Sequence, residues 1–86
     1  MSLRVLIEAR AAKKLEKLSK PLIQKNDDAI LSLSSNPRPP GAKLLRGKLK
    51  EGWRIRIADY RVLYRIDDDA QEIRIFEIGH RREIYR

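Results

Sequence analysis

The hydrophobic positions in the first third of the chain predict one strand and two helices. Residues 3–8 form a short apolar, partly β-branched run that is typical of a strand. Residues 9–18 then place alanine and leucine at helical spacing, which predicts an amphipathic helix. A second helix is expected to begin after Ser19, which can cap it, with Pro21 tolerated in its first turn. It is expected to end at Asn36, because a residue before proline is pushed out of the helical region.

From residue 53 the spacing of apolar residues changes to every second position. Residues 53–57 alternate tryptophan and isoleucine with arginine, so one face of this predicted strand is apolar and the other is basic. Residues 58–59 are short enough for a hairpin turn, although neither is the glycine that such turns prefer. Residues 60–66 continue the alternation and predict the partner strand of that hairpin.

A turn over residues 67–70 is expected to lead into a last strand, residues 72–78. That strand is apolar at both parities, which is typical of a central strand, and Gly79 is expected to end it. The order β-α-α-β-β-β predicts an α+β fold, with a helical hairpin on one face of a small, mainly antiparallel sheet. The first strand is expected to lie beside the last, and the second face of the sheet to remain open. Residues 1–86 are too few for more than one such domain.

The net charge draws attention to the open face. The chain holds 20 Lys and Arg against 12 Asp and Glu, a net charge of +8, which attracts nucleic acid, an anionic membrane surface or an acidic protein. Lysines dominate the basic residues of positions 1–42 and arginines those of positions 43–86. Lysines on a helix usually form a solvated face, whereas the guanidinium fork of arginine matches the geometry of phosphate. The arginines are therefore the candidate binding residues.

The composition also narrows the class of protein. With no cysteine, disulfides and thiolate chemistry are excluded, which suits a reducing cytoplasm, where we expect the protein to act. A single histidine argues against a metal site, and no cofactor is expected. No apolar run of the sequence is long enough to cross a bilayer, and the first residues are too charged for a secretory signal. Membrane binding by the first helix is disfavoured because its apolar side is mostly alanine.

Three arginines are expected to meet on the open face if the predicted hairpin forms. Arg54, Arg56 and Arg61 would then lie within a few residues of one another on adjacent strands. Like charges at that spacing repel, which predicts that a polyanion, most simply RNA, binds among them. Local neutralisation by nearby acidic groups is the alternative. Those groups are Asp59, Glu77 and the aspartates of residues 67–69.

Two groups in the closing segment have chemical potential. His80 could transfer a proton near neutral pH, and Tyr85 could stack on a base. A lone histidine is more often structural than catalytic, however, and a C-terminal tyrosine more often packs against the core. Residue type alone therefore favours a structural role for both His80 and Tyr85.

Three segments together resemble the RelE branch of the RelE/ParE toxin superfamily. They are residues 39–47 (PPGAKLLRG), 53–66 (WRIRIADYRVLYRI) and 79–85 (GHRREIY). The resemblance spans nearly the whole chain, including its order of elements. It implies the toxin of a type II toxin–antitoxin system, an mRNA interferase that cuts mRNA in the ribosomal decoding site and is held inactive by a cognate antitoxin.

The resemblance implies metal-free cleavage, in which the ribose 2′-hydroxyl attacks the neighbouring phosphate and leaves a 2′,3′-cyclic phosphate and a 5′-hydroxyl. Arg54 and Arg56 match the family's basic pair, and Arg61 matches its phosphate-gripping arginine. Well-known members carry lysines at the first two positions. Because arginine is not a credible general base, the chemistry would rest on electrostatics and positioning, or His80 would take the proton.

Further roles follow from the same resemblance. Arg81 matches an arginine that assists the leaving group, and Tyr85 a tyrosine that stacks on or orients the nucleotide. Arg46 matches a basic residue that supports RNA binding. Other candidates for contacts with RNA are Lys43, Arg65 and Arg82.

Two rival functions remain open at the level of the sequence. The ParE branch of the same superfamily inhibits DNA gyrase and cuts nothing, although the pair formed by Arg81 and Tyr85 favours the cleaving branch. A basic module that binds RNA without cutting it is the second rival. Such a module would show a strong dependence of binding on salt.

Overall fold

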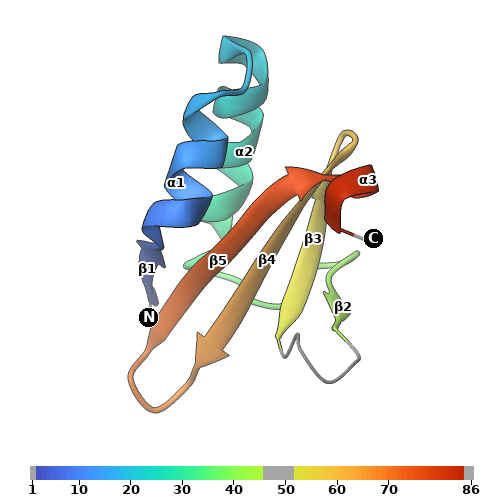
Figure 1. Ribbon diagram of the computed structural model, residues 1–86. Helices are drawn as coiled ribbons and strands as arrows, with labels where there is room; N and C mark the ends of the chain where they lie inside the picture. Colours follow the sequence, from blue (N-terminus) through green and yellow to red (C-terminus); the bar gives the residue numbers. More distant parts are fainter. Residues whose placement is uncertain (1, 46–51, 85–86) are drawn as a thin grey trace.

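The computed structural model describes residues 2–45 and 52–84 and confirms the predicted α+β fold (Figure 1). A five-stranded sheet has the strand order β1-β5-β4-β3-β2, with β1 parallel to β5 and the other neighbours antiparallel. The elements are β1 (Arg4–Ile7), α1 (Ala9–Glu16), α2 (Lys20–Leu33), β2 (Lys43–Leu44), β3 (Trp53–Ile57), β4 (Tyr60–Asp67), β5 (Glu72–His80) and α3 (Arg81–Ile84). The helical hairpin and the position of β1 beside the last strand are as predicted.

The second helix begins as predicted and ends earlier. Ser19 occupies the N-cap position in an extended conformation, but its side chain makes no capping hydrogen bond. Pro21 lies in the first turn, where its missing N–H costs nothing. The helix ends at Leu33 rather than at Asn36. There the carbonyl of Ser34 accepts a 2.8 Å hydrogen bond from Leu3 N, which joins the end of α2 to the start of β1. No helix of the described residues is long and apolar enough to span a bilayer.

A β-bulge changes one part of the prediction that the last strand is apolar on both faces, because Ile78 joins the helix-facing residues and only Phe76 remains on the other face. The register between β4 and β5 shifts between Leu63 and Tyr64. Because of this shift, Ile73, Ile75 and Ile78 all face the helices, although their spacing is irregular. Gly79 does not end the strand, which continues to His80.

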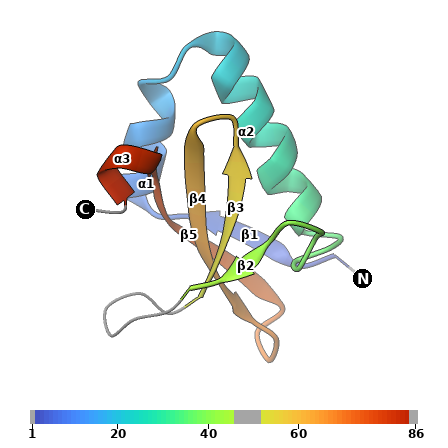
Figure 2. The ribbon, with the colours of Figure 1, turned by 90° about the vertical axis from the view of Figure 1, so that its right-hand side faces the viewer.

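The core lies between the helical hairpin and one face of the sheet. The two helices cover that face, and α2 and α3 lie on opposite sides of the β3–β4 hairpin (Figure 2). The buried apolar side chains of this core cluster come from both helices and from the three long strands. They are Ala11, Ile30, Leu33, Ile55, Ile57, Val62, Tyr64, Ile73, Ile75 and Ile78.

Tyr64 ties the proline-rich loop to this core. Its ring is fully buried, and its hydroxyl donates a 2.8 Å hydrogen bond to the carbonyl of Pro37. Burial raises the pKa of the Tyr64 hydroxyl to about 12, against a smaller lowering by the charge of Arg38. Arg38 also lies over the ring of Trp53, 5.6 Å from its centroid, and forms a 3.2 Å ion pair with Asp68.

The Tyr64 hydroxyl is expected to make stability depend on alkaline pH. In the unfolded chain this group ionises near pH 10, whereas in the folded chain it ionises near pH 12, so its contribution is complete below pH 10 and is lost as the pH rises to 12. Tyr64→Phe should lower the free energy of unfolding at pH 7 by about 0.5–1.5 kcal/mol, because the partly buried hydrogen bond to the Pro37 carbonyl is lost. Urea denaturation from pH 8 to 12 should then show a smaller alkaline loss in this variant than in the wild type.

Candidate functional site

Basic residues lie directly opposite one another on three neighbouring strands. Lys43 on β2 pairs with Arg54 on β3, and Arg56 on β3 pairs with Arg61 on β4. Residues in such pairs share a face of the sheet, with Cβ atoms roughly 4.5–5.5 Å apart. The hairpin therefore forms as predicted, and its register brings Arg54, Arg56 and Arg61 together. We call the four residues Lys43, Arg54, Arg56 and Arg61 the basic patch.

The face that carries the basic patch is less open than predicted. Arg61 is only 7% exposed, and Leu63, two positions further along β4, is completely buried. In the register Leu63 stands between Arg54 and Glu77, two residues whose longer side chains can cover it. Arg61 stands beside Gly79, which leaves room for a long side chain close to the sheet. A guanidinium confined in this way is preorganised for binding.

Arg56 and Arg61 of the basic patch differ in exposure and in the hydrogen bonds that they make. The Nη1 atom of Arg61 donates a 3.3 Å hydrogen bond to the carbonyl of Tyr60. Arg56 is exposed, and its Nε donates a 3.2 Å hydrogen bond to the carbonyl of Ala58 in the β3–β4 turn. Ala58 has a positive φ of 54°, so the turn forms without the preferred glycine at some conformational cost. The patch thus combines one buried and one exposed guanidinium on paired positions.

Of the acidic groups considered as neutralising partners, two have partners elsewhere. Asp68 forms its ion pair with Arg38, and Asp67 Oδ1 accepts a hydrogen bond from Ala70 N. Glu77 lies in the same row as Arg54, and its Oε1 is 3.6 Å from Arg10 Nη2 on α1. A carboxylate is therefore present at the β5 side of the patch, where it is shared with the first helix.

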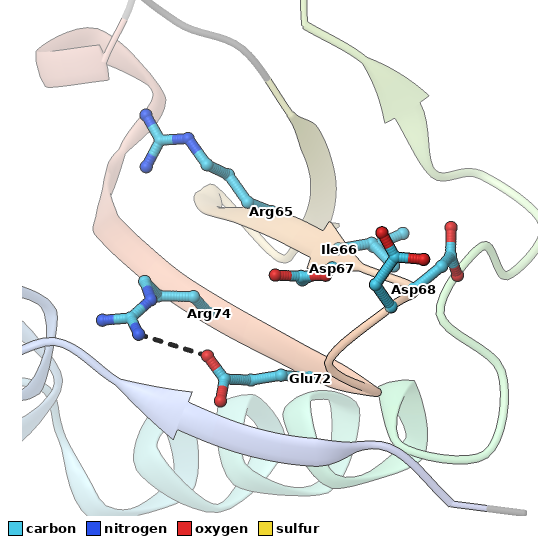
Figure 3. Close-up of a pocket in the computed structure, with 7 residues that line it drawn as sticks. Arg65, Ile66, Asp67, Asp68, Glu72 and Arg74 are labelled. Carbon is cyan, nitrogen blue, oxygen red and sulfur yellow. Dashed lines mark hydrogen bonds and ion pairs between the residues drawn. The ribbon is translucent and has the colours of Figure 1, made fainter.

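The β1 side of the same face is compensated by ion pairs. Glu72 lies 3.2 Å from Arg4 and 3.1 Å from Arg74, and Arg74 also lies 3.8 Å from Glu8. Figure 3 shows the pair of Glu72 and Arg74 on β5, beside a shallow hollow of about 620 Å³ that the β4–β5 turn also lines. Positive charge on this side of the sheet is therefore balanced by carboxylates of the sheet itself.

Arg65 belongs to this hollow and not to the basic patch. In Figure 3 its guanidinium points away from Asp67 and Asp68. It lies over the ring of Phe76, 3.9 Å from the centroid, which is the distance of a cation–π contact. Phe76 was not predicted as a support for Arg65, because the contact depends on the pairing of β4 with β5 and not on a pattern within either strand.

His80 lies apart from the basic patch. It pairs with Tyr60, whose parity on β4 is that of the helix-facing Val62, and the two rings meet edge to face with centroids 5.5 Å apart. His80 Nδ1 accepts a 3.2 Å hydrogen bond from Arg82 N, so the neutral ring carries its proton on Nε2. To accept a proton from a substrate, the ring would first have to give up the bond to Arg82. A role for His80 as general base stays a prediction.

Helix α3 brings Arg81 to the end of the sheet where the basic patch lies. Arg81 N donates a 2.9 Å hydrogen bond to the carbonyl of Asp59 in the β3–β4 turn, next to Ala58, which binds Arg56. Arg81 and Arg82 are both exposed. Arg46 and Tyr85 fall outside the described residues. No group of three or more His, Asp or Glu side chains arranged to hold a metal ion occurs in residues 2–45 and 52–84.

Comparison with known proteins agrees with this fold. The family model of the ParE toxin of type II toxin–antitoxin systems, parDE, matches residues 5–85. Toxin RelG of Mycobacterium tuberculosis is 41% identical over 58 residues, which are 67% of this chain and 66%, just under two thirds, of that protein. The toxin–antitoxin complex RelBE2 from the same organism has a TM-score of 0.82 at 28% identity, covering 93% of this chain and 99% of the other. The archaeal RelE–RelB complex from Pyrococcus horikoshii gives a TM-score of 0.82 at 27% identity, covering 94% and 97%.

Proposed function

Because this chain belongs to the RelE/ParE superfamily of type II toxin–antitoxin toxins, we propose that it is an endoribonuclease that cuts mRNA in the decoding site of the ribosome. The observation that carries the proposal is the pairing of Arg56 with Arg61 on adjacent strands, beside Arg54 and Lys43. Like charges placed directly opposite one another repel, and a polyanion bound across them would relieve that repulsion. A phosphodiester is the polyanion that guanidinium groups match in geometry.

The proposed reaction is an attack of the ribose 2′-oxygen on the adjacent phosphorus. A bond forms between these atoms and the bond from phosphorus to the 5′-oxygen breaks, while the 2′-hydroxyl loses a proton and the 5′-oxygen gains one. Negative charge grows on the phosphoryl oxygens as the transition state forms. Arg54, Arg56 and Arg61 would stabilise that charge, and Arg81 would assist the leaving 5′-oxygen.

The remaining proposed contacts orient the RNA. Tyr85 would stack on a base next to the cleaved bond, an interaction worth roughly 1–3 kcal/mol. Contacts with the backbone would come from Lys43, Arg46, Arg65 and Arg82. Arg65, held over Phe76 away from the basic patch, would bind a phosphate remote from the cleaved one.

We also propose that a cognate antitoxin restrains this activity and that the toxin acts in the cytoplasm. The RelBE2 structure is a toxin–antitoxin complex, and the Pyrococcus structure is a complex of RelE with RelB. A net charge of +8 favours an acidic partner, which would bind rapidly and cover basic residues. Strong expression of this chain without that partner should therefore arrest growth.

Primer extension on mRNA from induced cells tests the cleavage. The wild type is expected to produce new 5′ ends within translated codons, and an Arg81→Ala, Tyr85→Ala double variant is expected to produce none. Arg4→Ala, which removes an exposed arginine from the compensated side of the sheet, is the matched control and should cleave as the wild type does. Intact mRNA in wild-type cells whose growth is arrested would contradict the proposal.

Inhibition of DNA gyrase is the second candidate, favoured by the match of the ParE family model to residues 5–85. A gyrase supercoiling assay with purified protein separates the two functions. Loss of supercoiling together with intact mRNA would assign the chain to gyrase inhibition. Unchanged supercoiling together with cleaved mRNA would support the endoribonuclease.

A further inference from the structure

A second hollow lies between the C-terminal end of α1, the start of β4 and the end of β5. Its volume is about 330 Å³, and it is lined by Lys14, Lys17, Leu18, Tyr60, Ile78 and Gly79. Lys14 and Lys17 are exposed, whereas Ile78 and Gly79 are buried beneath them. The hollow therefore has an apolar floor and a cationic rim.

This hollow opens on the opposite side of the sheet from the basic patch. Tyr60 and Ile78 have the same parity as the helix-facing residues of β4 and β5, whereas Arg61 pairs with Gly79 on the other face. An occupant of the hollow would thus sit behind Arg61 and would leave Arg56 uncovered.

A stripe of basic residues on α1 leads to the hollow. Its members form two pairs that are four positions apart, residues 10 and 14 and residues 13 and 17, so they share one side of the helix. They are Arg10, Lys13, Lys14 and Lys17, and all four are exposed. An acidic chain that runs along this stripe would meet the hollow at the end of the helix.

We propose that the hollow binds a bulky apolar side chain of an acidic protein segment lying along α1. A phosphodiester backbone would gain nothing from covering Leu18 and Ile78, whereas a leucine or phenylalanine side chain gains by leaving water. The rim of lysines would pair with carboxylates on either side of that residue. That the segment belongs to the antitoxin rests on the proposed function, but its binding at this hollow does not. Such a segment anchors a partner without blocking the basic patch.

Fluorescence anisotropy with short labelled peptides tests this proposal. The probes are a glutamate-rich peptide with one central leucine, the same peptide with alanine at the centre, and the leucine peptide with every glutamate changed to glutamine. The leucine peptide is expected to bind roughly tenfold more tightly than the alanine peptide, since several buried methyl groups are lost. It should also shift the backbone amide signals of Ile78 and Gly79 in NMR spectra. The glutamine peptide should bind more weakly than the leucine peptide at low salt, and the two affinities should become equal at high salt.

Substitutions in the protein test whether the peptide binds at this hollow. Lys14→Glu with Lys17→Glu should weaken binding of the leucine peptide about tenfold or more at low salt. Lys20→Glu with Lys25→Glu makes the same change of charge on α2 and should leave the affinity within about twofold. Leu18→Gln alters the apolar lining without changing charge and should reduce the preference for leucine over alanine.

Four outcomes would overturn the proposal. Two concern the peptides: equal binding of the leucine and alanine peptides, and peptide-induced shifts confined to the basic patch. The other two would mean that α1 binds RNA: loss of mRNA cleavage in the Lys14→Glu, Lys17→Glu variant, and competition by an oligouridylate for the peptide. Failure of the wild type to cleave mRNA would instead contradict the proposed function and leave the peptide result standing.

Discussion

Replacing Arg56 with alanine is expected to slow mRNA cleavage by roughly 100- to 1000-fold, the usual cost of removing one preorganised donor to a developing oxyanion. Arg56 is exposed and pairs directly with the buried Arg61, so the two guanidiniums are placed to act on the same phosphate in the proposed reaction. Its one described hydrogen bond, to Ala58, joins exposed groups and contributes little to stability. Removing it also relieves the repulsion between the two guanidiniums. The loss should therefore fall on cleavage and not on folding.

Single-turnover cleavage of mRNA on programmed ribosomes would measure this effect, with urea denaturation as the check on folding. Arg56→Lys keeps the charge but loses the planar fork, so it should recover part of the rate. Arg74→Ala is the matched control, because Arg74 lies on the same face but is bound to Glu72 and Glu8. If Arg56→Ala and Arg74→Ala slowed cleavage equally, the basic patch would have no special role.

The sequence was sufficient to predict the β3–β4 hairpin and the meeting of its arginines. Period-two alternation on both strands specifies which side chains share a face, and a two-residue turn specifies the register. A slip by one residue would expose Ile55 or Val62. The position of β1 also followed from the order of the elements. Those parts of the candidate site depend on local patterns, and local patterns are visible in a sequence.

Other features depend on contacts between distant residues and were not predictable in this way. The bulge near Phe76 adds one residue to β5, and from there on the parity of the strand is reversed. That reversal places Ile78 on the helix-facing side and His80 beside Tyr60, away from the arginines with which His80 had been grouped. The two residues of β2 form a strand only because β3 pairs with them. The burial of Arg61 likewise depends on its neighbour on β5, Gly79, which is distant in the sequence.

Gly52→Ala is expected to destabilise the protein by about 3 kcal/mol or more, since it combines backbone strain with a collision. Gly52 has φ of 135°, a conformation that side chains rarely adopt. A Cβ atom there would overlap the carbonyl oxygen of Tyr64 and lie 3.2 Å from Cγ of Arg65. The carbonyl oxygen cannot move away cheaply, because Tyr64 is fixed in the core at the strand that pairs with Trp53.

Gly41→Ala separates the two causes of that loss. Gly41 also has a positive φ, 92°, but a Cβ atom there would have no neighbour within 4 Å. Its replacement should therefore cost only the backbone strain, about 1–2 kcal/mol. Urea denaturation followed by circular dichroism and by the fluorescence of Trp53, the single tryptophan, measures both variants. Equal destabilisation by the two substitutions would mean that β3 can shift away from β4 at little cost. Gly52 O also accepts a 2.8 Å hydrogen bond from Leu45 N, next to β2. If β3 is rigid, Gly52→Ala should break this bond and with it the pairing of Lys43 with Arg54.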